Sequence, residues 1–165
     1  MAHEFTTTYS MAGVSKGSLQ RCISDPEFHE RLCRSLPGDN LSITESTGSP
    51  GACIMKREVD LDVQLPEVVK KLLSGALRLK RADHWELHTL HCHSVYTMNL
   101  PASFELNQGF KEYSGGISIT NHWRVEVKIP LIGTSVARQI EPEIRRFHGV
   151  ELDMMSKMIS GGEDL

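Results

Sequence analysis

The chain has 165 residues, of which 39% are hydrophobic and 24% charged, a composition typical of an ordinary globular protein. This length suits one domain with a substantial core better than two small ones, so we expect a single domain over residues 1–160. The formal net charge is −3 and the 18 basic residues are dispersed among 21 acidic ones, which argues against nucleic acid as a partner.

The sequence shows no pattern of an export signal or a membrane span. The N-terminus, MAHEFTTTYS, lacks the basic-then-apolar order of a secretory signal, and no apolar run is long enough to cross a bilayer. Four cysteines, Cys22, Cys33, Cys53 and Cys92, form no C-x-x-C pair, so we expect reduced thiols. These features predict a cytoplasmic protein without a transmembrane segment.

The first part of the chain predicts one strand followed by two short helices. Residues 3–10, HEFTTTYS, are rich in β-branched and aromatic residues and alternate as a strand does. A short helix is predicted around residues 15–23. A second helix follows Ser24 or Asp25, because either residue can cap a helix that has Pro26 in its first turn.

The middle of the chain predicts an antiparallel meander with one small helix inserted. Two strand-like runs, LSITES and CIMKREVDLDV, are separated by the turn sequence GSPG, and the helix is predicted within VQLPEVVKKLLSG. Four further strand-like runs follow: LRLKRADHWEL, SVYTMNLPA, SFELNQGFKEY and ISITNHWRVEVKI. The last run alternates over its whole length, which is typical of a sheet with one buried and one solvated face.

The C-terminal part predicts one long amphipathic helix over residues 134–159. Its apolar stripe consists of Val136, Ile140, Ile144, Phe147, Val150, Met154 and Met158. Pro142 is expected to kink the helix or to mark a restart, and the tail 161–165 is expected to be frayed. Because a sheet with one apolar face needs a cover, we expect the sheet to curve around this helix.

Residues 84–93, HWELHTLHCH, hold four histidines and a cysteine. Their surroundings predict strand, turn and strand, in which His91 and His93 share one face and Cys92 lies on the other. Two neighbouring histidines could bind Zn²⁺ or Ni²⁺, but a dedicated site needs a third ligand, to which the sequence does not point. We therefore interpret the stretch as a polar turn, and predict no metal site and no cofactor.

Several polar residues fall on the predicted apolar face of the sheet. The alternation of LRLKRADHWEL places Arg81 and Asp83 there, the alternation of CIMKREVDL places Arg57 there, and Asn121 interrupts the apolar row of the last strand. A buried unpaired charge is strongly unfavourable. These groups therefore pair with one another, are turned outward by a bulge, or contact an anionic or hydroxylated head group of a ligand. Arginine suits the last task because its planar fork matches a carboxylate at two points.

The order of predicted elements resembles the helix-grip fold of the START-like (SRPBCC) superfamily, which includes the birch-pollen-allergen group and the polyketide cyclases. The stretches VVKKLLSGALRLKRADHWEL and WRVEVKIPLIGTSVARQIE carry the resemblance, and HEFTTTYS and DPEFHERL fit the same template. Over residues 3–159 the chain is similar to an actinobacterial family of unknown function in this superfamily. The resemblance implies an α+β fold, with a curved antiparallel sheet of six to seven strands around the C-terminal helix. The chain departs from the usual pattern at residues 84–93, where relatives tend to carry an ordinary hairpin turn.

The resemblance also implies a cavity between sheet and helix that holds a hydrophobic or amphipathic small molecule, such as a lipid or a polyketide. Methionines suit the wall of such a cavity because they are flexible, although the same residues also serve as plain core. The candidate ligand-binding residues are Met55, Arg57, Arg81, Asp83, Trp85, Met98, Asn121, Trp123, Phe147 and Met154. A non-enzymatic carrier or sensor is the function that we expect.

Two other functions stay open. A cyclase or aromatase would use the polar cavity residues as acid–base groups, but Asp83 beside an arginine would be a poor general base near neutral pH. The chain contains no G-x-S-x-G, no Gly-rich phosphate loop and no H-E-x-x-H motif, so no catalytic residue is predicted. Alternatively, the cavity is collapsed and the outer face of the sheet binds a protein partner. The sequence leaves the oligomeric state open.

Overall fold

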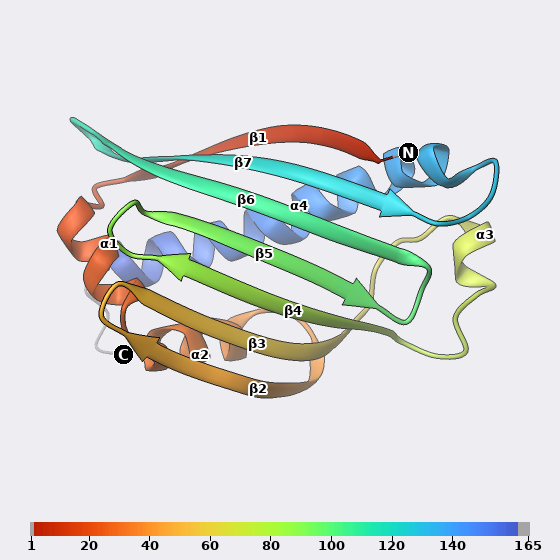
Figure 1. Cartoon of the computed structure of the whole chain (residues 1–165), viewed down its shortest axis with the longest axis horizontal. Coiled ribbons are helices and arrows are strands. Elements are labelled where there is room, and N and C mark those ends of the chain that lie inside the picture. The colour runs from red at the N-terminus through yellow and green to blue at the C-terminus, as the bar shows by residue number, and fades with distance from the viewer. Residues whose placement is uncertain (1, 162–165) are drawn as a thin grey trace.

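One antiparallel sheet forms the framework of the protein. In the computed structural model, which describes residues 2–161, its strands pair in the order β1-β7-β6-β5-β4-β3-β2 (Figure 1). The strands are β1 (His3–Ala12), β2 (Asp39–Ser49), β3 (Ala52–Leu61), β4 (Leu77–Glu86), β5 (His91–Met98), β6 (Ala102–Tyr113) and β7 (Gly116–Val127). Strands β2 to β7 form a meander in chain order, and β1 pairs with β7 at the far edge.

The helices are α1 (Lys16–Ile23), α2 (Pro26–Ser35), α3 (Glu67–Lys70) and α4 (Gly133–Ser160). The side chain of Ser15 caps α1 by accepting a hydrogen bond from the Ser18 backbone N–H. Asp25 caps α2 in the same way, with Pro26 in the first turn. The two short helices predicted after the first strand are therefore confirmed, and Asp25 is the cap of the second one.

Helix α4 lies along one face of the sheet (Figure 1) and contacts β1 and β7 as well as α1 and α2. The predicted helix-grip architecture, an α+β fold with a long C-terminal helix against a curved antiparallel sheet, is confirmed. The helix runs through Pro142 without a break, so the predicted restart is not seen. Ile140 and Ile144 are buried on either side of the proline, and this packing holds the helix together across the missing hydrogen bond.

Burial follows the period-two pattern that the sequence predicted for the last strand. In β7, Ile117, Ile119, Asn121, Trp123 and Val125 are buried, and the positions that alternate with them are half-buried or exposed. The outer face of the sheet is therefore solvated and the inner face is apolar.

The buried stripe of α4 differs from the prediction after Phe147. Val150 is exposed, whereas His148, Glu151, Leu152 and Met155 are buried. Polarity misled the prediction here, because His148 and Glu151 find hydrogen-bond partners inside the protein. The helix predicted between β3 and β4 is also shorter than expected, since α3 is a single turn.

The apolar interior is divided into two clusters. The first cluster packs α1, α2 and the end of α4 on the sheet and includes Leu19, Ile23, Phe28, Trp85, Phe110, Leu152 and Met155. The second cluster lies toward α3 and the start of α4 and includes Val69, Tyr96, Leu106, Trp123, Val136, Ile140 and Ile144. Among the helices that the structure describes, none is both long and apolar enough to cross a membrane.

Candidate ligand-binding site

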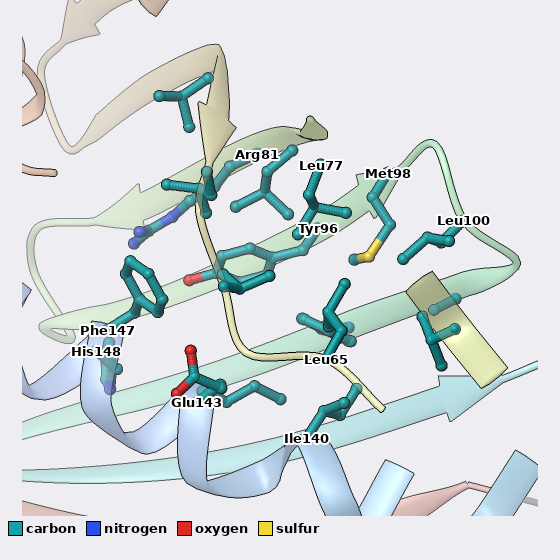
Figure 2. A pocket seen from close by; sticks show the side chains of 18 of the residues that line it. Leu65, Leu77, Arg81, Tyr96, Met98, Leu100, Ile140, Glu143, Phe147 and His148 are labelled. Carbon is teal, nitrogen blue, oxygen red and sulfur yellow. The ribbon is translucent and has the colours of Figure 1, made fainter. Parts of the chain in front are cut away.

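A cavity of about 150 Å³ lies within the second cluster, between the sheet and the first half of α4 (Figure 2). The two N-terminal helices pack mainly on the other end of the sheet (Figure 1), and of their residues Cys33 of α2 reaches the pocket wall. The wall is mostly apolar and includes Leu65, Val69, Leu77, Leu79, Met98, Leu100, Phe104, Trp123, Ile140, Ile144 and Phe147. An apolar cavity of about this volume can hold a small aromatic molecule such as benzene.

A band of polar side chains crosses the inner face of the sheet at the boundary between the two apolar clusters. It arises because one or two inward-facing positions on each of the neighbouring strands β3 to β7 carry polar residues, and two polar residues of α4 face the same line. We call this band the polar belt: Arg57, Arg81, Asp83, Ser94, Gln108, Asn121, His148 and Glu151, all buried.

Charged members of the polar belt pair with one another. Arg81 donates through Nε to Asp83 at 2.8 Å and through Nη1 and Nη2 to the two carboxylate oxygens of Glu151 at 2.5 and 2.8 Å. Arg57 donates through Nη1 to Asp83 at 3.2 Å, and the Ser94 hydroxyl donates to the same carboxylate at 2.5 Å. The alternative in which Arg57, Arg81 and Asp83 pair with each other is confirmed, with Glu151 as a fourth member that was not predicted.

The surrounding charges keep both carboxylates ionised. Burial opposes ionisation of Asp83, but the positive charges of Arg81 and Arg57 outweigh burial and lower the pKa of this carboxyl to about 2. Burial likewise opposes ionisation of Glu151, and Arg81 outweighs it, so that the pKa of Glu151 is also lowered. Two guanidinium groups therefore balance two carboxylates, and this part of the polar belt carries no net charge at neutral pH.

The other half of the polar belt is uncharged. Gln108 donates through Nε2 to the Asn121 side-chain oxygen at 2.9 Å and to His148 Nε2 at 3.3 Å. Burial lowers the pKa of His148 to about 4, so the imidazole is neutral and carries its proton on Nδ1. The ring packs edge-on against Trp123, with the centroids 5.1 Å apart.

Tyr96 brings a hydroxyl group without a protein partner to the pocket. Its side chain lines the cavity and the residue is 5% exposed, yet the hydroxyl has no hydrogen-bond partner among the described residues. In Figure 2 the hydroxyl points across the pocket toward α4, on the side of Phe147 and His148. Burial raises the pKa of Tyr96, so the hydroxyl keeps its proton and can donate a hydrogen bond.

Arg57 has spare donors at the same end of the pocket. Arg57, Arg81 and Tyr96 are register partners on β3, β4 and β5, so the three residues form a row across neighbouring strands. Within the described residues, Arg57 uses only Nη1 for a hydrogen bond, whereas Arg81 uses all three guanidinium nitrogens. Arg57 and Tyr96 therefore offer free donors, and Arg81 does not.

Of the ten residues predicted to bind a ligand, Arg57, Arg81, Met98, Trp123 and Phe147 line the cavity. The other five lie outside its wall: Met55, Asp83, Trp85, Asn121 and Met154. Trp85 and Met154 belong to the first apolar cluster or pack against it, and Asp83 and Asn121 bind other members of the polar belt.

Most other lining residues are apolar, and the residues not predicted from the sequence include three with polar groups: Tyr96, His148 and Glu151. A signal for each was present. Tyr96 is in phase with the buried positions of its strand, and His148 and Glu151 lie four and seven residues after Ile144, which is helical spacing.

The stretch HWELHTLHCH forms the predicted hairpin, because β4 ends at Glu86 and β5 begins at His91. His84 and His93 are cross-strand partners, and His93 Nε2 lies 3.4 Å from a carboxylate oxygen of Glu105. Over residues 2–161, no three side chains of His, Cys, Asp or Glu converge as metal ligands would. The predicted order of strand, turn and strand is confirmed, and the absence of a metal site in this stretch stays a prediction.

Comparisons with known proteins bear on the family and the fold. The family model described as "Protein of unknown function (DUF2505)" matches residues 5–159. No curated protein is significantly similar to this sequence.

Solved structures show the same fold at low identity. The crystal structure of TTHA0849 from Thermus thermophilus is 12% identical with a TM-score of 0.68, covering 98% of this chain and 100% of that one. A point mutant of norcoclaurine synthase from Thalictrum flavum, in complex with a transition-state analogue, is 14% identical with a TM-score of 0.67, covering 96% and 94%. A START superfamily protein from Mycobacterium smegmatis is 15% identical with a TM-score of 0.52, covering 96% and 95%.

Proposed function

Because the chain belongs to the DUF2505 family of proteins of unknown function and has a helix-grip fold, we propose that it binds an apolar small molecule carrying one hydrogen-bond acceptor. The supporting observation is the Tyr96 hydroxyl, which faces an apolar pocket without a partner among the described residues. A ligand oxygen that accepts a hydrogen bond from this free donor would contribute about 0.5–1.5 kcal/mol to binding. We also propose that the chain forms one domain and that the protein is cytoplasmic.

The shape of the pocket supports a fixed orientation for the ligand. Apolar side chains such as Leu65, Met98 and Ile140 form the wall away from the polar belt (Figure 2), and would bury the apolar body of a lipid-like or polyketide-like molecule. The acceptor group would lie at the opposite end, beside the donors of Tyr96 and Arg57.

The charge balance of the polar belt favours a neutral head group, a hydroxyl or a carbonyl, over a carboxylate. An anion would lose its hydration and lie near the ionised Asp83 and Glu151, while Arg81 is already engaged with both. We therefore assign the contact with the head group to Tyr96 and Arg57 in place of the predicted Arg81.

The pKa shifts support a binding protein more than a cyclase. General acid–base catalysis works best with groups that titrate near the working pH. In the pocket, the pKa of Glu151 is lowered, that of His148 is lowered to about 4, and that of Tyr96 is raised. Each shift moves the pKa of the group further from neutral pH, so none of the three groups titrates near the working pH.

Isothermal titration calorimetry with three matched ligands tests the proposal: naphthalene, 2-naphthol and 2-naphthoate. We expect 2-naphthol to bind about fivefold more tightly than naphthalene, as one additional hydrogen bond would give. The carboxylate is expected to bind no better than the alcohol. Tyr96→Phe should abolish the preference for 2-naphthol while leaving naphthalene binding nearly unchanged.

Tyr113→Phe is the matched control, because this tyrosine lies on β6 at an exposed position and bonds Ser10 outside the pocket. If none of the three ligands binds, the proposed function is wrong. Equal preferences in Tyr96→Phe and Tyr113→Phe would contradict the role of the Tyr96 hydroxyl.

A further inference from the structure

Exposed apolar side chains gather at the end of the molecule where the pocket lies. Among the described residues, seven large hydrophobic residues are exposed, and four of them lie on α3 with its following turn or on the β7–α4 loop. We call these four the apolar tip: Val68, Leu72, Leu131 and Ile132. Figure 1 shows α3 and the β7–α4 loop at the same end of the sheet. Both segments also contribute side chains to the second apolar cluster and to the wall of the pocket.

Leu131 is the most unusual member of the apolar tip. Its exposure is 105% of the reference value and its φ is 72°, in the left-handed region, which costs a non-glycine residue roughly 1–2 kcal/mol. The loop is tightly constrained, since a Cβ on Gly133 would lie 2.2 Å from the Val127 carbonyl oxygen. The fold therefore holds a leucine outward in a strained conformation and gains no packing from it.

The surroundings of the apolar tip carry a small excess of positive charge, although the whole chain has a net charge of −3. Four exposed cations lie in or beside the two segments: Lys70, Lys71, Lys128 and Arg138. Lys70 is 3.6 Å from Glu67, whereas the other three have no ion-pair partner within the part of the chain that the structure describes. The same two stretches, residues 62–72 and 126–138, hold three acidic residues, Asp62, Glu67 and Glu126, so the tip has a small excess of positive charge.

We propose that the apolar tip docks on the surface of an anionic lipid bilayer. Exposed apolar side chains flanked by lysines match the chemistry of that surface, because the apolar groups enter the boundary between head groups and acyl chains. The cations remain among the anionic head groups. Docking in this orientation turns the α3 end of the pocket toward the lipid, which gives an apolar molecule a route that avoids water. Docking of the tip on lipid does not require a ligand in the pocket.

Co-sedimentation with lipid vesicles tests the docking. We expect the protein to bind vesicles of phosphatidylcholine and phosphatidylglycerol in equal parts, to bind pure phosphatidylcholine more weakly, and to dissociate from the anionic vesicles as salt is added. Leu131→Asn should reduce the partition coefficient by about tenfold through the loss of apolar contact. Asparagine suits the left-handed conformation, so this variant should keep the fold.

Two matched variants separate the tip from general surface effects. Val95→Asn replaces another exposed aliphatic residue, which lies on the outer face of β5 and outside the tip. This variant should bind vesicles as the unmodified protein does. Lys71→Gln combined with Lys128→Gln should weaken binding to anionic vesicles by at least about tenfold. Lys111→Gln combined with Lys157→Gln, at exposed positions outside the tip, should weaken it far less.

Two results would overturn the proposal. Protein that stays in the supernatant with both kinds of vesicle would exclude lipid docking and leave the tip as a surface for a protein partner. Equal partition of Leu131→Asn and Val95→Asn would exclude the tip as the point of contact. Thermal melting of each variant shows that it is folded, and unchanged binding of 2-naphthol by Leu131→Asn separates this test from that of the proposed function.

Discussion

At the scale of single residues, the bidentate contact between Arg81 and Glu151 sets the position of the helix on the sheet. It joins β4 to α4 across 70 positions of sequence. Buried ion pairs contribute little net stability, because desolvation offsets their attraction, but a broken pair is strongly unfavourable. The pair therefore specifies one placement of α4. In that placement the first half of the helix packs on β7 and β1 and lines one side of the pocket.

Replacing His148 should change the response of the protein to acid. The folded pKa of about 4 is lower than the ordinary value of 6.5, so the unfolded chain takes up the proton first as the pH falls. Stability from the neutral imidazole is present above pH 6.5 and is lost between pH 6.5 and 4. His148→Gln should reduce that loss by up to about 1.4 kcal/mol per pH unit, measured as free energy of unfolding in urea.

His84→Gln, at an exposed position on β4, is the control and should respond to pH as the unmodified protein does. Part of the loss should persist in His148→Gln, because burial also lowers the pKa of His29. An identical pH response in His148→Gln and the unmodified protein would contradict a neutral His148 in the folded state.

The periodicity of apolar residues in the sequence identified the inward-facing charged residues on the strands but not the one on the helix. Strict alternation placed Arg57, Arg81 and Asp83 on the inner face, and all three are buried there. On α4, an apolar stripe drawn through residues such as Val150 passed beside Glu151, because a carboxylate is assumed to face solvent. Glu151 is buried because it pairs with Arg81. The periodicity of one helix carries no information about a contact with a residue 70 positions away.

At the scale of elements, the two halves of α4 pack in different surroundings. The second half packs with α1 and α2 through residues such as Leu152 and Met155, whereas the first half forms a wall of the pocket through Val136, Ile140 and Ile144. The predicted strands were recognisable because alternation persists over long runs. The length of helix α3 was overestimated, because its apolar residues lie in two different environments: Val69 is buried and Val68 is exposed.

Two glycines of α4 should respond oppositely to replacement by alanine. A Cβ on Gly149 would meet nothing within 4 Å, so Gly149→Ala should raise the free energy of unfolding by about 0.5–1 kcal/mol through helix propensity. A Cβ on Gly133 would lie 2.2 Å from the Val127 carbonyl oxygen, so Gly133→Ala should destabilise the protein. Urea unfolding measures both changes, and equal effects of the two substitutions would contradict this packing of α4.

At the scale of the whole molecule, the sheet is covered unequally. Helices α1 and α2 fill one end of its inner face with side chains, and the one-turn α3 with its loops closes the other end (Figure 1). The first end is a solid core and the second contains the cavity, with the polar belt between them. The resemblance recognised in the sequence implied a cavity between sheet and helix but could not say which end it occupies. That depends on how far two short helices extend over the sheet.

Native mass spectrometry of the protein purified from its own host tests the binding function most directly. The unmodified protein is predicted to carry the added mass of a small apolar molecule, and so is Val150→Trp, which enlarges an exposed position of α4. Ile140→Trp fills the pocket from the same helix and is predicted to fold but to carry no added mass. A bare mass for all three proteins, or the same bound mass on Ile140→Trp, would contradict a ligand in this pocket.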